Sequence, residues 1–298
     1  HLTLAQREVI LLAKANNGIT LKGIHRVSAD VICVQAPDDC ASVQRHRSTD
    51  PYVNAIASMV MQKLNDKLAQ DKAVTTVPPQ PTGDGKWTGM GPGGIDTVNW
   101  VPWFNLSSVT LPPPPAFGRQ QDLAEVQAVK TALQNLTPFQ HGSLLLWAGS
   151  KGSETPGGIW LGLADRYINE ENASATRAAT VRASAMMAVH DAFIYCWQEK
   201  FRYWTARPTM RDPSIQTVIP TPNFPSYPSG HATISGAAAV VLKSYFPNKG
   251  QDIDMYAQEA ADGRVWGGIH FPIDSVEGLK AGASIGAITV KNSPTFAF

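Results

Sequence analysis

The chain has 298 residues and a mass of 32.1 kDa, with 25 lysine and arginine residues against 24 aspartate and glutamate residues. This balance lacks the basic excess of nucleic-acid-binding proteins and of polybasic membrane anchors. An apolar content of 43% is too high for a disordered chain. The apolar runs, residues 235–242 among them, are far shorter than the roughly 20 residues of a membrane-spanning helix. We therefore expect a folded protein with no membrane span and no nucleic-acid partner.

The N-terminal segment, residues 1–71, contains two stretches with helical spacing of apolar side chains. They are residues 2–15 and residues 53–71, where Val53, Ile56 and Val60 recur at threes and fours. This spacing predicts N-terminal helices.

Residues 72–120 form an insert with nine prolines and seven glycines. Proline at this density is incompatible with helix interiors, and so long an irregular stretch is either a linker or a functional covering loop. Trp87, Trp100 and Trp103 favour a covering loop, because a solvated linker has no use for three large apolar rings.

Helical spacing returns in residues 121–298. It is strongest over residues 181–200, and further helices are predicted from Ser229 and from Pro272, since proline is favourable in the first turn of a helix. No alternating apolar pattern indicates a sheet. The sequence thus predicts an all-α bundle in which residues 1–298 form a single domain.

Some other patterns carry little weight. Residues 89–94 match G-x-G-x-x-G, but neither the strand nor the helix of a dinucleotide site flanks them. Cys33, Cys40 and Cys196 leave at least one thiol unpaired; Cys33 and Cys40 could form a disulfide in an oxidising compartment or remain small thiols.

Three segments in the last third of the chain carry groups suited to chemistry: residues 200–208, 228–231 and 264–274. Lys200, Arg207 and Arg264 are cations suited to binding an oxyanion. Ser229 and Gly230 lie at a predicted helix start, where free N–H groups attract anions.

The same segments contain two histidines. His270 and Asp274 are four residues apart, so the carboxylate could hold the imidazole in one tautomer and leave the other nitrogen to attack or to coordinate. His231 is available as a general acid or base. If the segments converge, they form a cage for a multiply charged tetrahedral anion.

Together the segments resemble a known signature. The pattern K-x6-R-P, P-S-G-H and S-R-x5-H-x3-D is typical of the superfamily shared by vanadium-dependent haloperoxidases and type 2 phosphatidic acid phosphatases. Gly263 stands where that family usually has serine, and we expect only a modest loss of local hydrogen bonding. The resemblance runs from about Leu136 to the last helix, whereas residues 1–110 match little that we can name. It implies a helical bundle with a covering loop.

The resemblance also implies a cofactor and its ligands. Vanadate, or phosphate in the same site, would be bound, with Nε2 of His270 as the vanadium ligand and Asp274 behind it. His231 would deprotonate hydrogen peroxide, and Lys200 would polarise the peroxide for attack by a halide. The residues expected to hold the anion are Lys200, Arg207, Ser229, Gly230, Arg264 and His270.

The halide site follows from two aromatic positions. Trp197 and Phe224 stand where chloride-oxidising members carry residues that line this site, so hydrogen peroxide and halide are the expected substrates. Two alternatives stay open: a soluble acid phosphatase that acts through a phosphohistidine, and an anion-binding or assembly protein without turnover. The resemblance further suggests export to the periplasm or beyond the cell, without a targeting segment in this chain, and assembly into a homo-oligomer.

Overall fold

The computed structural model describes residues 62, 66, 67, 69–71, 76, 78–149 and 153–293. Within them it shows helices, turns and one isolated bridge, between Lys86 and Thr205, and no strand, which confirms the predicted all-α class. None of the helices in this part is long and apolar enough to cross a membrane. Its elements are η3 (Ile95–Asn99), α4 (Gln120–Gln134), α5 (Pro138–Leu146), α6 (Thr155–Glu170), α7 (Ala175–Tyr203), α8 (Pro208–Arg211), α9 (Gly230–Tyr245), η4 (Pro247–Lys249), α10 (Gly250–Trp266) and α11 (Pro272–Asn292).

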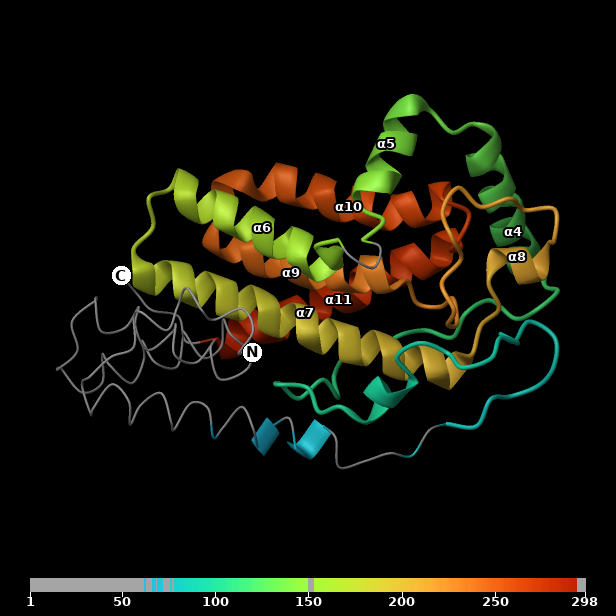
Figure 1. Cartoon of the computed structure of the whole chain (residues 1–298), viewed down its shortest axis with the longest axis horizontal. Helices are drawn as coiled ribbons and strands as arrows, with labels where there is room; N and C mark the ends of the chain where they lie inside the picture. The colour runs from blue at the N-terminus through green and yellow to red at the C-terminus, as the bar shows by residue number, and fades with distance from the viewer. Residues whose placement is uncertain are drawn as a thin grey trace, which may run out of the picture.

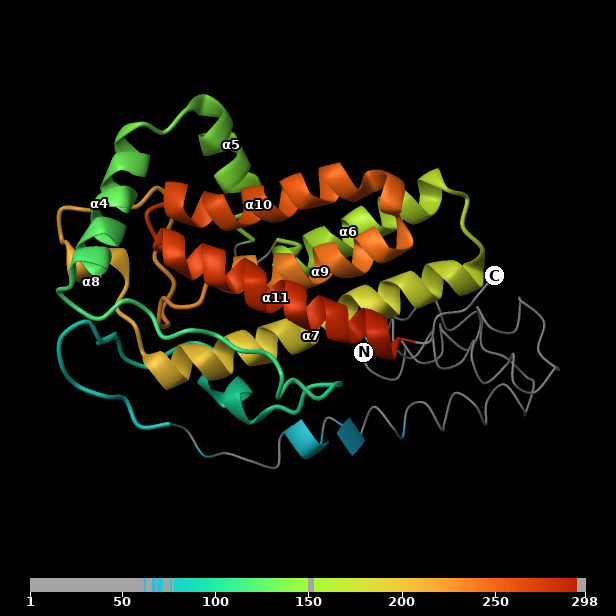
Figure 2. The same cartoon turned by 180° about the vertical axis from the view of Figure 1, so that it is seen from behind.

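Five long helices form the body of the molecule. Figure 1 shows α6, α7, α9, α10 and α11 running lengthwise beside one another, with α4, α5 and α8 gathered at one end. The view from behind places α11 in front of α9 (Figure 2). Most residues of α9 are buried, as expected for a helix that neighbours cover on all sides.

The apolar stripe predicted over residues 181–200 is the buried face of α7. Val181, Ala185, Ala188 and Ala192 are fully buried in the main core. The helix runs three residues beyond the predicted end at Lys200 and stops where Trp204 adopts a left-handed conformation, with φ 52°. These three residues lie between Lys200 and the segment that leads to Arg207.

Helices α9 and α11 approach each other closely. Gly278, Gly282 and Gly286 recur every four residues on α11, and a Cβ at Gly282 would lie 2.1 Å from the carbonyl oxygen of Thr233 on α9. Only glycine allows the two backbones to come so near. This contact brings the beginning of α9 beside the beginning of α11.

The described part of the insert packs on α7. The indole of Trp87 is buried against Trp204, with ring centroids 6.1 Å apart, and the backbone N–H of Trp87 donates to the Trp204 carbonyl over 2.7 Å. Further along, both carboxylate oxygens of Asp191 accept backbone N–H groups, those of Trp103 and Phe104. The tryptophans thus serve packing on the bundle, as their presence in the sequence suggests.

Some sequence predictions concern residues that the structure does not describe, or describes only in part. The predicted helix at residues 2–15 and the cysteines Cys33 and Cys40 lie outside the described residues. Of residues 53–71, those that are described are helical. Cys196 is a buried free thiol.

Candidate active site

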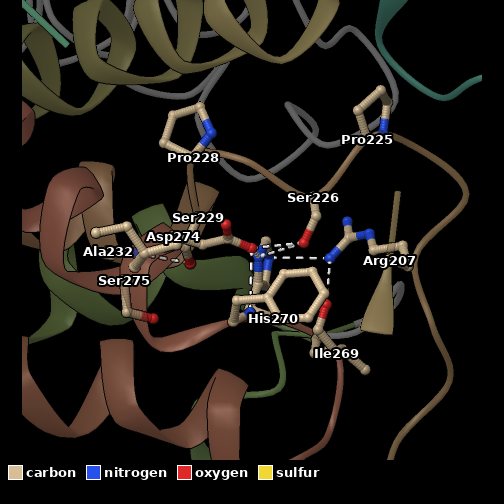
Figure 3. Close-up of polar contacts among 12 residues, drawn as sticks. Arg207, Pro225, Ser226, Pro228, Ser229, Ala232, Ile269, His270, Asp274 and Ser275 are labelled. Atoms are coloured by element: carbon tan, nitrogen blue, oxygen red, sulfur yellow. Dashed lines mark hydrogen bonds and ion pairs between the residues drawn. The ribbon is translucent and has the colours of Figure 1, made fainter. Parts of the chain in front are cut away.

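The second and third segments of the signature meet at the starts of α9 and α11. Ser229 is the N-cap of α9, its hydroxyl accepting the N–H of Ala232 over 3.4 Å, and its own backbone N–H donates to the carbonyl of Asp274 over 2.9 Å. Pro272 begins α11, and Asp274 lies in its first turn. The close approach of α9 to α11 therefore joins two segments that are about 40 residues apart in sequence (Figure 3).

His270 lies at the centre of this junction. Its Nδ1 is 2.8 Å from Oδ2 of Asp274 and 3.3 Å from the hydroxyl of Ser226. Ser226 also donates to the same carboxylate oxygen, which accepts the backbone N–H of Phe271 as well. The carboxylate is thus positioned to hold the proton of His270 on Nδ1 and to leave Nε2 as the basic nitrogen.

Burial controls the ionisation of this pair. It raises the pKa of Asp274 to about 6, against the opposing effect of the Ser226 hydrogen bond. Burial, and then the charges of Arg207 and Lys200, hold the pKa of His270 well below its usual 6.5. At neutral pH the imidazole is therefore uncharged and the carboxylate is ionised, the state that the hydrogen bond at Nδ1 requires.

Arg207 approaches His270 from the other side. Its Nη1 lies 3.0 Å from Nε2 of His270 and donates to the carbonyl of Ile269 over 2.7 Å, while Nε donates to the carbonyl of Phe224. Its guanidinium is fully buried, and burial lowers its pKa to about 10. The sequence prediction placed Arg207 and His270 in one site, and the structure brings them into contact.

Lys200 is also fully buried, and its ammonium lies over the loop before α9. Nζ donates to the carbonyls of Pro225, Ser226 and Pro228 at distances between 2.5 and 2.9 Å. These three bonds use all the N–H groups of the ammonium. Burial lowers the pKa of Lys200 to about 7. In this arrangement Lys200 orders the loop, and a direct bond to an anion requires one of the three N–H groups to turn away.

Arg264, near the end of α10, completes the set of cations. Its Nη2 donates to the carbonyl of Leu144 over 2.8 Å, and burial lowers its pKa to about 10. The neighbouring Gly263 faces the same residue, since a Cβ there would lie 3.3 Å from the Leu144 Cα. A Cβ at this position would require Leu144 to shift by a few tenths of an ångström, so the glycine found in place of the family's serine allows a slightly closer approach of α5 to α10.

His231 is in the first turn of α9. Its Nε2 is buried and has no hydrogen-bond partner within the described structure. Burial, and then the charge of Arg264, lower its pKa well below 6.5, so the imidazole is neutral and can accept a proton.

An oxyanion suits the donors that this site leaves without a partner. Apart from Nε2 of His231, which is available to accept a proton, the described structure leaves two donors, Nη2 of Arg207 and Nε of Arg264, buried and unpaired. A buried polar group without a partner costs about 1–3 kcal/mol. The first N–H groups of α9, at Gly230 and His231, also lack partners within their own helix. Two guanidinium N–H donors and a helix N-terminus form a donor set that fits vanadate or phosphate.

An aromatic wall borders the site. The ring of Trp197 stacks on Phe193 with centroids 4.1 Å apart and lies 5.1 Å from Phe224. Lys200 Nζ is 5.8 Å from the Trp197 ring and 5.3 Å from that of Phe224. The structure thus places both predicted halide-site residues next to Lys200.

The wall faces a cavity of about 1000 Å³. Gly230, His231, Arg264 and His270 line one part of it, whereas Lys200, Arg207 and Ser229 are buried and are not among its lining residues.

The sequence prediction missed three contributors to the site. Ser226, which binds both His270 and Asp274, stands within a segment quoted for the resemblance but received no role. The other two contributors have no sequence signal at all. They are the backbone carbonyl of Leu144 and the backbone carbonyl of Gly93, which accepts the Trp197 indole N–H over 3.1 Å. These contacts are made by backbone atoms, so residue type does not reveal them.

Comparison with known proteins agrees with this geometry. Residues 178–297 match the model of the PAP2 superfamily. Vanadium chloroperoxidase of Curvularia inaequalis is 33% identical over 141 residues, which are 37% of this chain and 23% of that protein. The match therefore spans less than a quarter of the relative's length.

Solved structures share this fold. A bacterial vanadium-dependent iodoperoxidase superposes with a TM-score of 0.75 and 22% identity, covering 97% of this chain and 88% of that one. The apo form of a bacterial vanadium-dependent chloroperoxidase gives 0.76 and 13% identity, covering 97% and 91%. The chain has the fold of the vanadium haloperoxidases.

Proposed function

We propose that this chain is a vanadate-dependent haloperoxidase, which oxidises halide with hydrogen peroxide to hypohalous acid. Residues 178–297 match the PAP2 superfamily, and the chain has the fold of the vanadium haloperoxidases. The observation that carries the proposal is the pair of buried, unpaired donors of Arg207 and Arg264, together with the unpaired Nε2 of the neutral His231 and a His270 whose tautomer Asp274 holds. The partial identity to vanadium chloroperoxidase supports the same assignment.

Each residue has a role that follows from its surroundings. Arg207, Arg264, Ser229 and the first N–H groups of α9 would hold vanadate, with Nε2 of His270 as its ligand and Lys200 as a further cation. When bound, vanadate supplies a Lewis-acid centre that activates hydrogen peroxide towards a halide. These residues come from α7 and the segment after it, from the start of α9, from α10 and from the loop before α11, so the site depends on the packing of the whole bundle.

Proton transfer falls to His231. Its imidazole is neutral at pH 7, because its pKa lies well below 6.5, and it lines the cavity beside His270 and Arg264. It can therefore take a proton from hydrogen peroxide that enters the cavity. Trp197 and Phe224 would keep the halide in a partly dry pocket, where the Lys200 charge acts more strongly than in water.

Bromination of monochlorodimedone tests the proposal. The purified protein loaded with vanadate should brominate this compound when peroxide and bromide are present, and His270→Ala should abolish both bromination and vanadate retention. His141→Ala is the matched control, because His141 is exposed on α5. Vanadate retention by His270→Ala that equals that of the wild type would refute the ligand assignment.

The rival activity uses the same residues and is separated by a second assay. Phosphate and vanadate share a tetrahedral shape, and Nε2 of His270 could attack a phosphomonoester while His231 protonates the leaving alcohol. Hydrolysis of p-nitrophenyl phosphate by the vanadate-free protein, without any halogenation after loading, would establish the phosphatase. Failure of both assays in a folded protein that still binds phosphate would favour an anion-binding protein without turnover.

A further inference from the structure

The cavity extends well beyond the oxyanion site. Met186, Val189, Phe193 and Trp197 line it along one face of α7. Met186 and Trp197 are eleven positions apart, which at 1.5 Å per residue is about 16 Å of helix. Trp197 belongs to the predicted halide site, so the wall continues for about three turns past the place where the chemistry is proposed.

This volume exceeds the needs of peroxide and halide. A water molecule in the liquid takes about 30 Å³, and both substrates are of comparable size. The cavity holds about 1000 Å³, which is at the upper end of the range of about 300–1000 Å³ that small-molecule sites occupy. There is room for an organic molecule beside the anion.

The lining defines the chemistry of that molecule. It is mainly apolar, and α6, α7, the loop before α9 and α9 itself contribute to it. Among its described members, Arg264 is the one Lys, Arg, Asp or Glu, and it lies at the anion end. The apolar members include Leu161, Met186, Val189, Phe193, Ile219 and Ile234.

The aromatic wall favours one class of ligand. Phe193, Trp197 and Phe224 form a continuous row of rings at 4.1 and 5.1 Å. Such rings stack with other aromatic rings, and the absence of a carboxylate or a lysine from the described lining favours a ligand without charge.

We propose that this cavity binds a neutral aromatic compound next to the oxyanion site, as the acceptor of the oxidised halogen. This proposal rests on the haloperoxidase activity for its chemistry but not for the binding itself. Hypohalous acid gives its halogen to a ring carbon: the carbon–halogen bond forms, the oxygen–halogen bond breaks, and the released ring proton combines with hydroxide to give water. The bound acceptor would meet the oxidant before it diffuses into solution.

Binding of 2-naphthol, a neutral aromatic probe, tests the cavity without any turnover. The probe is titrated into the vanadate-free protein at pH 7 by calorimetry, with Leu161→Trp as the variant that fills the cavity from α6. Leu123→Trp is the matched control, since Leu123 is 57% exposed on α4 and does not line the cavity. The wild type and the control should bind alike, and Leu161→Trp should bind about tenfold more weakly, because its indole would occupy volume that the probe needs; this is about 1.4 kcal/mol.

Two further measurements keep the test decisive. Val189→Phe fills the cavity from α7 and serves if Leu161→Trp does not fold, as judged by its circular dichroism and melting curve. Inorganic phosphate at saturation should leave 2-naphthol binding intact, because the two sites are adjacent and separate. Equal binding by filled and control variants, or binding of naphthyl phosphate but not of 2-naphthol, would overturn the proposal; the second result would indicate an apolar phosphomonoester instead.

The outcomes also separate this proposal from the proposed function. Tight binding of 2-naphthol with no halogenation of any substrate would leave the cavity assignment standing and remove the haloperoxidase. Bromination of monochlorodimedone without saturable binding of 2-naphthol would support the haloperoxidase and refute the cavity assignment. If both hold, Leu161→Trp should slow the bromination of 2-naphthol relative to that of monochlorodimedone, and Leu123→Trp should not.

Discussion

Arg207 donates from Nη1 to Nε2 of His270 over 3.0 Å, so a guanidinium N–H occupies the imidazole nitrogen that the family resemblance assigns to vanadium. Arginine can only donate, and this contact therefore requires the proton of His270 to reside on Nδ1, towards Asp274. Binding of an oxyanion would turn the same N–H groups to the anion and free the Nε2 lone pair.

Replacement of Asp274 by asparagine tests this tautomer. The amide keeps the size of the side chain but can donate to Nδ1, which places the proton on Nε2 and removes the ligand lone pair. We expect vanadate affinity to fall about 10- to 100-fold, the usual effect of losing the partner behind a ligating histidine. Equilibrium dialysis with vanadate measures it. Asp254→Asn, at a residue 60% exposed and paired with Lys243, should change nothing, and an unchanged affinity in Asp274→Asn would contradict the tautomer assignment.

Lys200 should make stability depend on pH in the alkaline range. Its pKa is about 7 in the folded protein and 10.5 as the ordinary value, so between these pH values the unfolded chain holds a proton that the folded one lacks. The free energy of unfolding of the wild type, relative to Lys200→Met, should therefore rise with pH by up to about 1.4 kcal/mol per unit, and should not change below pH 7.

Urea unfolding of both proteins at a series of pH values from 7 to 10 measures this difference. Saturating phosphate should weaken the dependence, because a nearby anion favours the charged lysine. A difference that stays constant from pH 7 to 10 would show that the carbonyls of the loop before α9 outweigh burial and keep Lys200 charged.

Asp191 is expected to anchor the insert. It is fully buried on α7, and Asp191→Ala would leave the backbone N–H groups of Trp103 and Phe104 without their acceptors. We expect the free energy of unfolding to fall by about 3 kcal/mol, as for loss of hydrogen bonds to a buried charge. Urea denaturation checks this value. Asp165→Ala, which breaks an ion pair with Arg182 at a 41% exposed carboxylate, should cost less than about 1 kcal/mol.

Gly94 provides a test of how the insert holds Trp197. It has φ +75°, and a Cβ there would lie 2.2 Å from the indole Nε1. Gly118 has nearly the same φ, +73°, with open space around it, so Gly118→Ala reports the cost of the backbone conformation alone. Gly94→Ala should destabilise the protein by about 1–3 kcal/mol more than Gly118→Ala, the usual cost of overpacking. Thermal melts and indole fluorescence measure the difference; equal costs would mean that the loop moves freely off Trp197.

Local sequence was sufficient for the parts of this protein in which the interacting residues are neighbours in the chain. Apolar spacing on α7 predicted a helix because the helical repeat brings those side chains onto one face. Ser229 as N-cap and the four-residue spacing of His270 and Asp274 are likewise local, and the structure shows both. The family resemblance then carried the expectation that the three segments converge. The division into a single domain of residues 1–298 stays a prediction.

Tertiary structure decided the contacts between distant segments. Lys200 could be recognised as a cation, but only the folded loop before α9 shows that three backbone carbonyls bind it. Leu144 and Arg264, 120 residues apart, meet where α5 packs on α10. Such contacts depend on how helices pack and on backbone atoms that every residue shares, so no spacing in the sequence encodes them. The near-zero net charge of the chain likewise concealed that three cations, Lys200, Arg207 and Arg264, are buried at one site.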